Sequence, residues 1–238
     1  MDEQTVYGLK AVLALLEMRP EAVMRLYYRA DRLDRLKGTL SWLAARRLPY
    51  RELDEEGLRK VAGGPHHEGV VVVSQPLRHA AAPQDGLPAG PWLALDGLDN
   101  PHNVGAILRS AAFFGAAGVL VGGVDADAKV NAAVLRVSEG GAEHLRLCAA
   151  PELASLLAKL ATGMPVLGLE TDARQDLRDA PRASTFVLAV GNEQSGLSPA
   201  VRRACSALYS IPGSGRVGSL NVSVAAGVAL AMLTANRR

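Results

Sequence analysis

The second part of the chain alternates short, wholly apolar runs with segments of helical periodicity, and this alternation limits the folds it can adopt. Strands that are apolar on both faces need helices on both sides of the sheet. The pattern therefore predicts an α/β domain built on a largely parallel sheet. The expected strands lie at 92–96, 118–122, 144–149, 165–169, 185–190 and 207–211. The expected helices lie at 100–115, 130–139, 151–161, 198–204 and 220–235.

The first part of the chain predicts a smaller α/β unit in the order α-β-α-β-α-β. Its helices are expected at 5–18, 33–46 and 54–62, and its clearest strands at 23–29 and 70–73. The sequence PLRHAAAPQDGLPAGP at 76–91 is rich in proline and has no apolar period, as linkers do. We therefore expect a first domain over 1–75, a linker over 76–91 and a second domain over 92–238.

The overall composition excludes several classes of protein. The net charge of +2 excludes no partner: it gives no global field that would mark a nucleic-acid-binding protein, but a local basic face can exist within that balance. Cys148 and Cys205 lie far apart in apolar surroundings, which excludes a disulfide framework and a cysteine-based zinc site. His66 and His67 lack the HExxH spacing, so we expect no metal. The first residues form no signal peptide and no run of 18 apolar residues occurs, so we expect a cytoplasmic protein without a membrane partner.

Three polar loops follow predicted strand ends near residues 95, 190 and 211, and each then enters a helix. In a parallel sheet, ligands bind beyond the carboxyl ends of the strands. In the helix that follows the first of these loops, Arg109 lies about 140° from Val104 around the helix axis. Arg109 therefore lies off the apolar face of the helix and can contact either a ligand or water. Asn103 and Asn221 can equally be helix caps, and Glu193 can sit near a helix dipole.

The third loop also contains GSGRVG at 213–218, which has the GxGxxG spacing of a dinucleotide site. That fingerprint requires an acidic residue about 20 positions further on to bind a ribose. This chain has no acidic residue after Glu193. The missing acidic residue therefore argues against a nicotinamide-dependent oxidoreductase.

Three longer segments carry a resemblance to a known family. NPHNVGAILRSAAFFG at 100–115, GNEQSGLS at 191–198 and IPGSGRVGSLNVSVAA at 211–226 resemble, in order and spacing, the three motifs of the SpoU/TrmH family of RNA ribose 2′-O-methyltransferases. YGLKAV at 7–12 and HHEGV at 66–70 resemble the ribosomal-protein-like RNA-binding domain that precedes the catalytic domain in many members. Here HisHisGlu stands where members often have HisGln.

The resemblance implies a deep trefoil knot in the second domain, S-adenosyl-L-methionine as cofactor, and a homodimer with an active site built across the interface. By motif position it assigns the cofactor to Gly191, Asn192, Ile211, Pro212, Leu220 and Asn221. It assigns catalysis to Asn103, Arg109, Glu193, Ser219 and Asn221.

The implied function is methyl transfer to a ribose 2′-hydroxyl of structured RNA. The front domain favours 23S rRNA over tRNA, because tRNA-modifying members often lack it, and the 2′-hydroxyl requirement leaves DNA unexpected. A non-catalytic RNA-binding or ribosome-assembly protein is the alternative outside enzymes. Aromatic residues make up only 4% of the chain, so we expect recognition through backbone, shape and arginine contacts. The candidates are Tyr27, Tyr28, Arg29, Arg46 and Arg47, all of which can equally be ordinary residues of a strand or a solvated helix.

Overall fold

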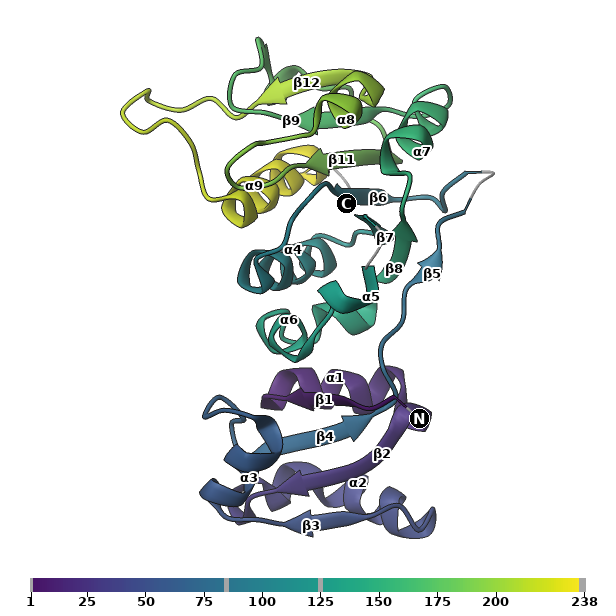
Figure 1. The fold of residues 1–238 in the computed structure, drawn as a ribbon, viewed down its shortest axis with the longest axis vertical. Helices are drawn as coiled ribbons and strands as arrows, with labels where there is room; N and C mark the ends of the chain where they lie inside the picture. Colours follow the sequence, from purple (N-terminus) through teal and green to yellow (C-terminus); the bar gives the residue numbers. More distant parts are fainter. Residues whose placement is uncertain (1, 84–85, 124–125, 236–238) are drawn as a thin grey trace. The chain divides into compact units, whose positions relative to one another are not determined.

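The computed structural model describes residues 2–83, 86–123 and 126–235 (Figure 1). The chain forms two compact units. The first consists of Met1–Leu77 together with Val130–His144, and the second of Arg78–Lys129 together with Leu145–Arg238. The predicted domain boundaries at 75 and 92, and the function of each domain, stay predictions. The two units are described separately.

The first unit is built on a four-stranded sheet in the order β1-β4-β2-β3. Strand β4 (Val70–Ser74) runs antiparallel to β1 (Gln4–Tyr7) and β2 (Val23–Tyr28), and β3 (Tyr50–Glu52) is parallel to β2. Its helices are α1 (Leu9–Met18), α2 (Leu33–Ala45) and α3 (Glu55–Ala62), with 3-10 turns η1 (Pro20–Ala22) and η2 (Ala30–Arg32). Helix and strand residues that are fully buried form its core, among them Val12, Leu15, Leu26, Leu36, Leu43 and Leu58.

The predicted helix at 5–18 is wrong at its start. Residues 4–7 form β1, in which Val6 pairs with Val72 of β4, and the helix begins only at Leu9. Gly8 separates the two elements with φ of 92°, a conformation that residues other than glycine rarely adopt. Val6 has helical spacing from Leu9, but Thr5, Val6 and Tyr7 are residue types that favour strands. The first unit therefore begins with a strand.

The segment at 130–144 lies in the predicted second domain, yet it packs into the first unit. Its helix α6 (Ala132–Val137) contacts β1, and its 3-10 turn η3 (Gly141–His144) contacts α1. Arg19 donates two hydrogen bonds to Glu143, Nε to Oε2 at 2.6 Å and Nη2 to Oε1 at 2.9 Å. Because the Glu143 side chain is only 3% exposed, this ion pair is part of the interior of the unit.

The second unit contains an eight-stranded sheet in which all neighbours are parallel, as predicted. Its order is β10-β12-β9-β11-β6-β7-β8-β5. The strands are β5 (Ala80–Ala81), β6 (Pro91–Leu95), β7 (Gly118–Gly122), β8 (Arg146–Ala150), β9 (Val166–Leu169), β10 (Gln175–Asp176), β11 (Phe186–Val190) and β12 (Ala207–Ser210). The helices are α4 (Pro101–Phe113), α5 (Ala126–Lys129), α7 (Leu153–Leu160), α8 (Pro199–Ala204) and α9 (Val222–Thr234), with a 3-10 turn η4 (Leu177–Asp179).

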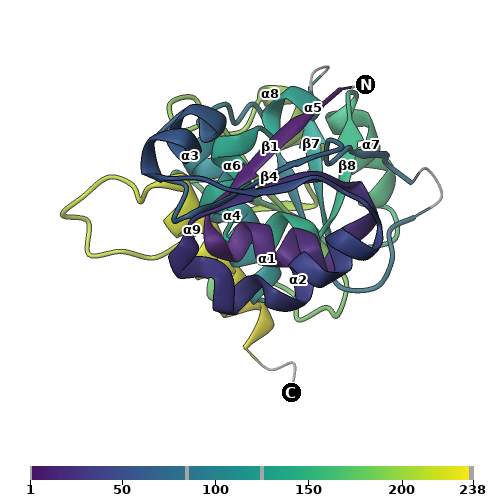
Figure 2. The same ribbon diagram turned by 90° about the horizontal axis from the view of Figure 1, so that it is seen from below.

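Helices cover both faces of this sheet. Helices α7 and α8 pack together, and they bury Trp92, Ala94 and Leu120 of the sheet. Figures 1 and 2 show α4 and α9 side by side on the other face. The two cross closely, since a Cβ on Gly227 would lie 3.4 Å from Ser110 Oγ. Among the described residues, no helix is long and apolar enough to cross a membrane. The predicted trefoil knot stays a prediction.

Two short strands and one helix end differ from the prediction. The predicted linker contains β5, which pairs with β8 through Ala80 and Cys148, and β10 was also not predicted. Strands of two residues are too short to give an apolar period. Helix α4 ends at Phe113, so the exposed Gly115, with φ of 70°, is not part of its buried stripe. Helix α4 is capped by Asn100, whose side chain accepts from His102 N–H at 2.9 Å.

The ion pair between Arg19 and Glu143 predicts a large stability difference. We expect Glu143→Ala to lower the free energy of unfolding by about 3–5 kcal/mol, because it leaves a largely buried guanidinium without its carboxylate. The control is Lys10→Ala, which removes an exposed ion pair with Glu139 that joins the same two segments, and it should cost less than about 1 kcal/mol. Urea denaturation measures both values. Equal small losses would mean that the first unit does not depend on the buried pair.

Candidate active site

The side-chain amide of Asn103 joins three of the predicted site residues. Its Nδ2 donates to Glu193 Oε1 at 2.7 Å, and its Oδ1 accepts from Asn221 Nδ2 at 3.0 Å. These residues are 90 and 118 positions away from Asn103 in sequence, and they follow β11 and β12. The three polar loops identified in the sequence therefore meet at the start of α4.

The alternative roles as helix caps hold for only one of the two asparagines. Asn221 is the N-cap of α9, because its Oδ1 accepts from Ser223 N–H at 2.9 Å. Asn103 lies inside the first turn of α4, whose cap is Asn100. The carboxylate of Glu193 contacts this first turn, where a negative charge interacts favourably with the helix dipole. The cap and dipole interactions thus coexist with the hydrogen-bond network.

Arg109 and Ser219 are exposed. Arg109 lies on α4 six residues after Asn103, a rise of about 9 Å along the helix axis. Ser219 lies two residues before Asn221. The hydrogen bonds described above unite Asn103, Glu193 and Asn221, and the catalytic roles of all five residues stay predictions.

The loop that follows β11 is shaped by its own asparagine. Asn192 Nδ2 donates to the carbonyl of Gly97 at 2.8 Å, and Asn192 Oδ1 accepts from Gln194 N–H at 2.9 Å. The backbones of Asn192 and Gly196 exchange hydrogen bonds of 3.0 and 2.9 Å. A Cβ on Gly191 would lie 2.1 Å from the Gly196 carbonyl carbon, so the turn requires glycine there. The side chain and the backbone of Asn192 therefore both hold this loop in shape.

Two carboxylates that the sequence analysis did not select fix the far end of the same loop. Glu170 Oε1 accepts from Leu197 N–H at 2.8 Å, and Asp96 Oδ2 accepts from Ser198 N–H at 2.7 Å. Asp96 directly follows β6 and Glu170 directly follows β9. An acidic residue directly after an apolar strand was therefore the signal that could have identified both.

Neither of the two cysteines is suited to nucleophilic chemistry. Burial, together with the negative charges of Asp96 and Glu170, raises the pKa of the Cys205 thiol to about 12. Burial also raises the pKa of Cys148. Both side chains are therefore protonated near neutral pH, when a cysteine nucleophile would have to be a thiolate. Within the described residues, no cluster of His, Cys, Asp and Glu could hold a metal ion.

The loop between β12 and α9 presents its backbone to solvent. Ile211 is half-buried, whereas Pro212 and Leu220 are exposed, Leu220 to 50%. Figure 1 shows this loop, in yellow-green, projecting from the sheet and helices of the second unit. Within the described part of the chain, Arg216 has the only backbone N–H between 213 and 219 with an acceptor, Ser214 Oγ at 3.4 Å. A ligand that bonds to backbone groups would find them available here.

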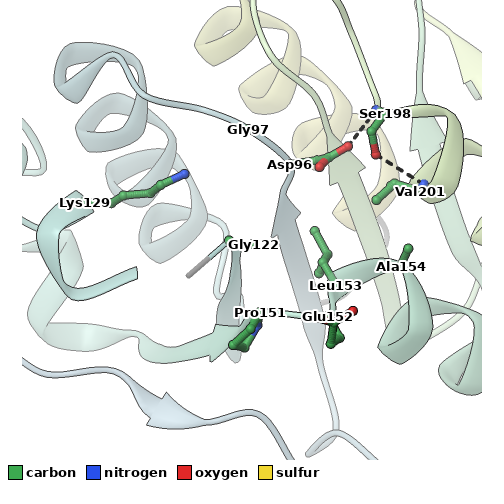
Figure 3. A pocket seen from close by; sticks show the side chains of 11 residues that line it. Asp96, Gly97, Gly122, Lys129, Pro151, Glu152, Leu153, Ala154, Ser198 and Val201 are labelled. Atoms are coloured by element: carbon green, nitrogen blue, oxygen red, sulfur yellow. Dashed lines mark hydrogen bonds between the residues drawn. The ribbon is translucent and has the colours of Figure 1, made fainter. Parts of the chain in front are cut away.

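A cavity of about 330 Å³ lies at the carboxyl ends of β6, β7 and β8 (Figure 3). Its lining residues are Asp96, Gly97, Gly122, Gly123, Lys129, Pro151, Glu152, Leu153, Ala154, Ser198 and Val201. Lys129 Nζ lies 3.2 Å from Asp99 Oδ1. None of the predicted catalytic or cofactor residues lines this cavity, although Gly97 accepts the hydrogen bond from Asn192. The cavity and the Asn103 network are therefore separate features, and both involve the loop between β11 and α8.

Reversing one hydrogen bond tests the Asn103 network. We expect N103D to lower the free energy of unfolding by about 1–3 kcal/mol, because it replaces the donor to Glu193 with a second carboxylate. The added substitution E193Q supplies a new donor, so the double variant should recover most of the loss. Thermal unfolding measures both effects.

The control for that test is N131D. Asn131 caps α6 only by accepting hydrogen bonds, which an aspartate also does, so its stability should stay within about 0.5 kcal/mol of the parent protein. Additive losses in the N103D/E193Q variant would contradict the network.

Two protein-family models together match most of the chain. Residues 91–231 match the SpoU rRNA methylase family, and residues 5–80 match the substrate-binding domain of RNA 2′-O ribose methyltransferases. The 23S rRNA (guanosine-2′-O-)-methyltransferase RlmB of Pseudomonas aeruginosa is 38% identical over 237 residues. That alignment covers 95% of this chain and 94% of the relative.

Solved structures give the same comparison at the level of the fold. A crystal structure of an RNA 2′-O ribose methyltransferase has a TM-score of 0.77 and 27% identity, covering 99% of this chain and 89% of that one. The SpoU methyltransferase AviRb from Streptomyces viridochromogenes, in complex with the cofactor AdoMet, has a TM-score of 0.76 and 25% identity. It covers 99% of this chain and 90% of its own. Both units of the chain thus have counterparts in single proteins of known structure.

Proposed function

Since this chain belongs to the SpoU rRNA methylase family, we propose that it transfers a methyl group from S-adenosylmethionine to a ribose 2′-hydroxyl of 23S rRNA. The network of Asn103, Glu193 and Asn221 carries the proposal, because it brings the three family motifs to one place. The match of residues 5–80 to a substrate-binding domain supports RNA as the substrate. In this proposal residues 1–75 bind RNA, 76–91 link, and 92–238 carry the reaction.

The backbone around the second and third loops would hold the cofactor. When bound, S-adenosylmethionine supplies an electrophilic methyl group on its sulfonium. Gly191 and the exposed segment from Ile211 to Leu220 offer backbone groups, and the half-exposed Leu220 side chain offers an apolar contact. Asn192 and Asn221 act indirectly, since their side chains fix the two loops.

Arg109 would act on the ribose by charge. A neutral hydroxyl is a poor nucleophile, and its oxygen becomes negative as its proton leaves. A guanidinium stays charged at neutral pH, so Arg109 serves to hold a substrate phosphate and stabilise the developing alkoxide. Asn103 orients the first loop, Glu193 braces the second, and Ser219 contacts substrate or cofactor. These roles follow from their motif positions.

A homodimer completes this proposal. Helices α4 and α9 pack together but leave large apolar side chains in solvent: Phe113 is 82% exposed, Val224 50% and Val228 36%. Exposed apolar side chains gathered on adjacent helices are typical of protein interfaces. A second copy of the chain would cover them through the same surface, as two-fold dimers do.

The dimer predicts a sharp response to one charge. We expect V224D to convert the protein into monomers, because association would bury a carboxylate without a partner. Light scattering coupled to gel filtration gives the molar mass. The control, L33D, places the same charge at an exposed leucine of the first unit and should leave the dimer intact. A V224D variant that remains dimeric would exclude this interface.

The catalytic proposal predicts a separation of binding from reaction. We expect R109A to lose methyl transfer by at least about 100-fold, because transition-state charge is then unstabilised, while S-adenosylmethionine binding by calorimetry is retained. R109K keeps the charge without the planar fork and should retain only part of the activity. The assay maps new 2′-O-methyl groups by mass spectrometry after incubation with an unmodified 23S rRNA transcript. Full activity of R109A would contradict the proposed role of Arg109. Methylation of tRNA but not of 23S rRNA would mean that tRNA is the substrate.

A further inference from the structure

The first unit contains a cavity of about 450 Å³, whose wall includes a partly exposed aromatic side chain. Its lining residues come from η1, the start of β2, the end of α2 and the segment before β3. They are Pro20, Glu21, Val23, Trp42, Arg46 and Leu48. The cavity thus combines an apolar wall with one acidic and one basic side chain.

The two tryptophans of the chain have different surroundings. Trp92 is fully buried, and its indole Nε1 donates to the Pro88 carbonyl at 2.9 Å. Trp42 is partly exposed in the cavity, and none of the residues at 2–83, 86–123 and 126–235 accepts a hydrogen bond from its indole N–H. Buried or interfacial indoles usually satisfy this donor. Trp42 therefore presents both a ring and an unused donor.

The arginine beside Trp42 keeps its charge available. The Arg46 guanidinium carbon lies 4.4 Å from the centroid of the Trp42 ring, in cation–π contact. Across the described part of the chain, no carboxylate forms an ion pair with Arg46 or the exposed Arg47. By contrast, Arg19 and Arg29 of the same unit bind carboxylates. Among the described residues, Arg46 in the cavity wall and Arg47, its neighbour in sequence, are therefore cations without an ion-pair partner.

We propose that this cavity binds an unpaired nucleobase of the RNA substrate. Proteins that recognise RNA stack unpaired bases on aromatic rings and on the planes of arginine side chains. Here the base would contact Trp42 and Arg46, and Arg46 and Arg47 would neutralise the flanking phosphates. Glu21 can accept from an exocyclic amino group of the base. The indole N–H lies in the plane of the ring, so it can donate to a ribose or phosphate oxygen beside the stacked base. The occupant of the cavity is inferred from the function proposed above, so the test must separate the two.

The first experiment observes Trp42 directly. The full-length protein labelled with nitrogen-15 has two indole resonances, and that of Trp42 is the one lost in W42F. We expect AMP, GMP, CMP or UMP to shift the Trp42 resonance and leave Trp92 unmoved, whereas ribose 5-phosphate moves neither. If ribose 5-phosphate shifts the Trp42 resonance as much as the nucleotides do, the cavity binds phosphate and not the base, which would contradict the proposal. No shift with any nucleotide would overturn the proposal.

The second experiment measures affinity for RNA with matched variants. We expect W42A to weaken binding of a 23S rRNA transcript by about 5- to 100-fold and W42F to retain most of it, since stacking on one aromatic ring has this magnitude. R46A should weaken binding more than K37A, which removes an exposed cation from the same helix that is paired with Asp34. Equal losses in R46A and K37A would indicate charge alone and contradict a stacking site. Circular dichroism establishes that W42A is folded.

Kinetics separate this site from the proposed reaction. If W42A raises KM for the RNA while kcat is little changed, both inferences hold. A protein that never methylates RNA, but whose Trp42 resonance responds to nucleotides, would refute the proposed function and support the cavity. Normal methylation by W42A with an unresponsive Trp42 resonance would refute the cavity alone.

Discussion

The candidate site depends on satisfying one buried amide. Asn103 is 8% exposed and makes one hydrogen bond as a donor and one as an acceptor, each to a different loop. A buried polar group that loses a partner pays the full cost of its desolvation. Displacing either loop would impose that cost, so the start of α4, Glu193 and the cap of α9 hold one another in place. The geometry of the site is thus specified by polar complementarity among three distant segments.

The loop after β11 and the loop after β12 differ in how many hydrogen bonds hold them. The loop at 191–198 is fixed at one end by Asn192 and at the other by Asp96 and Glu170, each through hydrogen bonds to the backbone. The segment at 213–219 has almost no internal hydrogen bonds and is exposed throughout. A rigid loop can orient reacting groups before substrate arrives. An open segment can instead complete its hydrogen bonds with a ligand or with a second copy of the chain.

Prediction from the sequence succeeded where burial on both faces forces an unbroken apolar run. The central strands β6, β7 and β11 are buried on both faces, so their apolar runs were unambiguous. The exposed two-residue strand β5 left no such pattern. Asp96 and Glu170 were missed because a single acidic residue after a strand also suits an exposed turn. The packing of residues 130–144 into the first unit could not be predicted, since it joins segments that local periodicity cannot relate.

The net charge of the chain says less about RNA binding than the positions of its individual charged side chains. A net charge of +2 suggests no preference for RNA, because 24 acidic residues nearly balance 26 basic ones. In the folded first unit, that balance is made locally: Arg19 and Arg29 are neutralised by carboxylates, whereas Arg46 instead lies over an indole. Phosphate contacts need uncompensated cations, and base contacts need an exposed ring beside them. Binding capacity is therefore set by which ion pairs folding forms, and Trp42 and Arg46 lie where it forms none among the described residues.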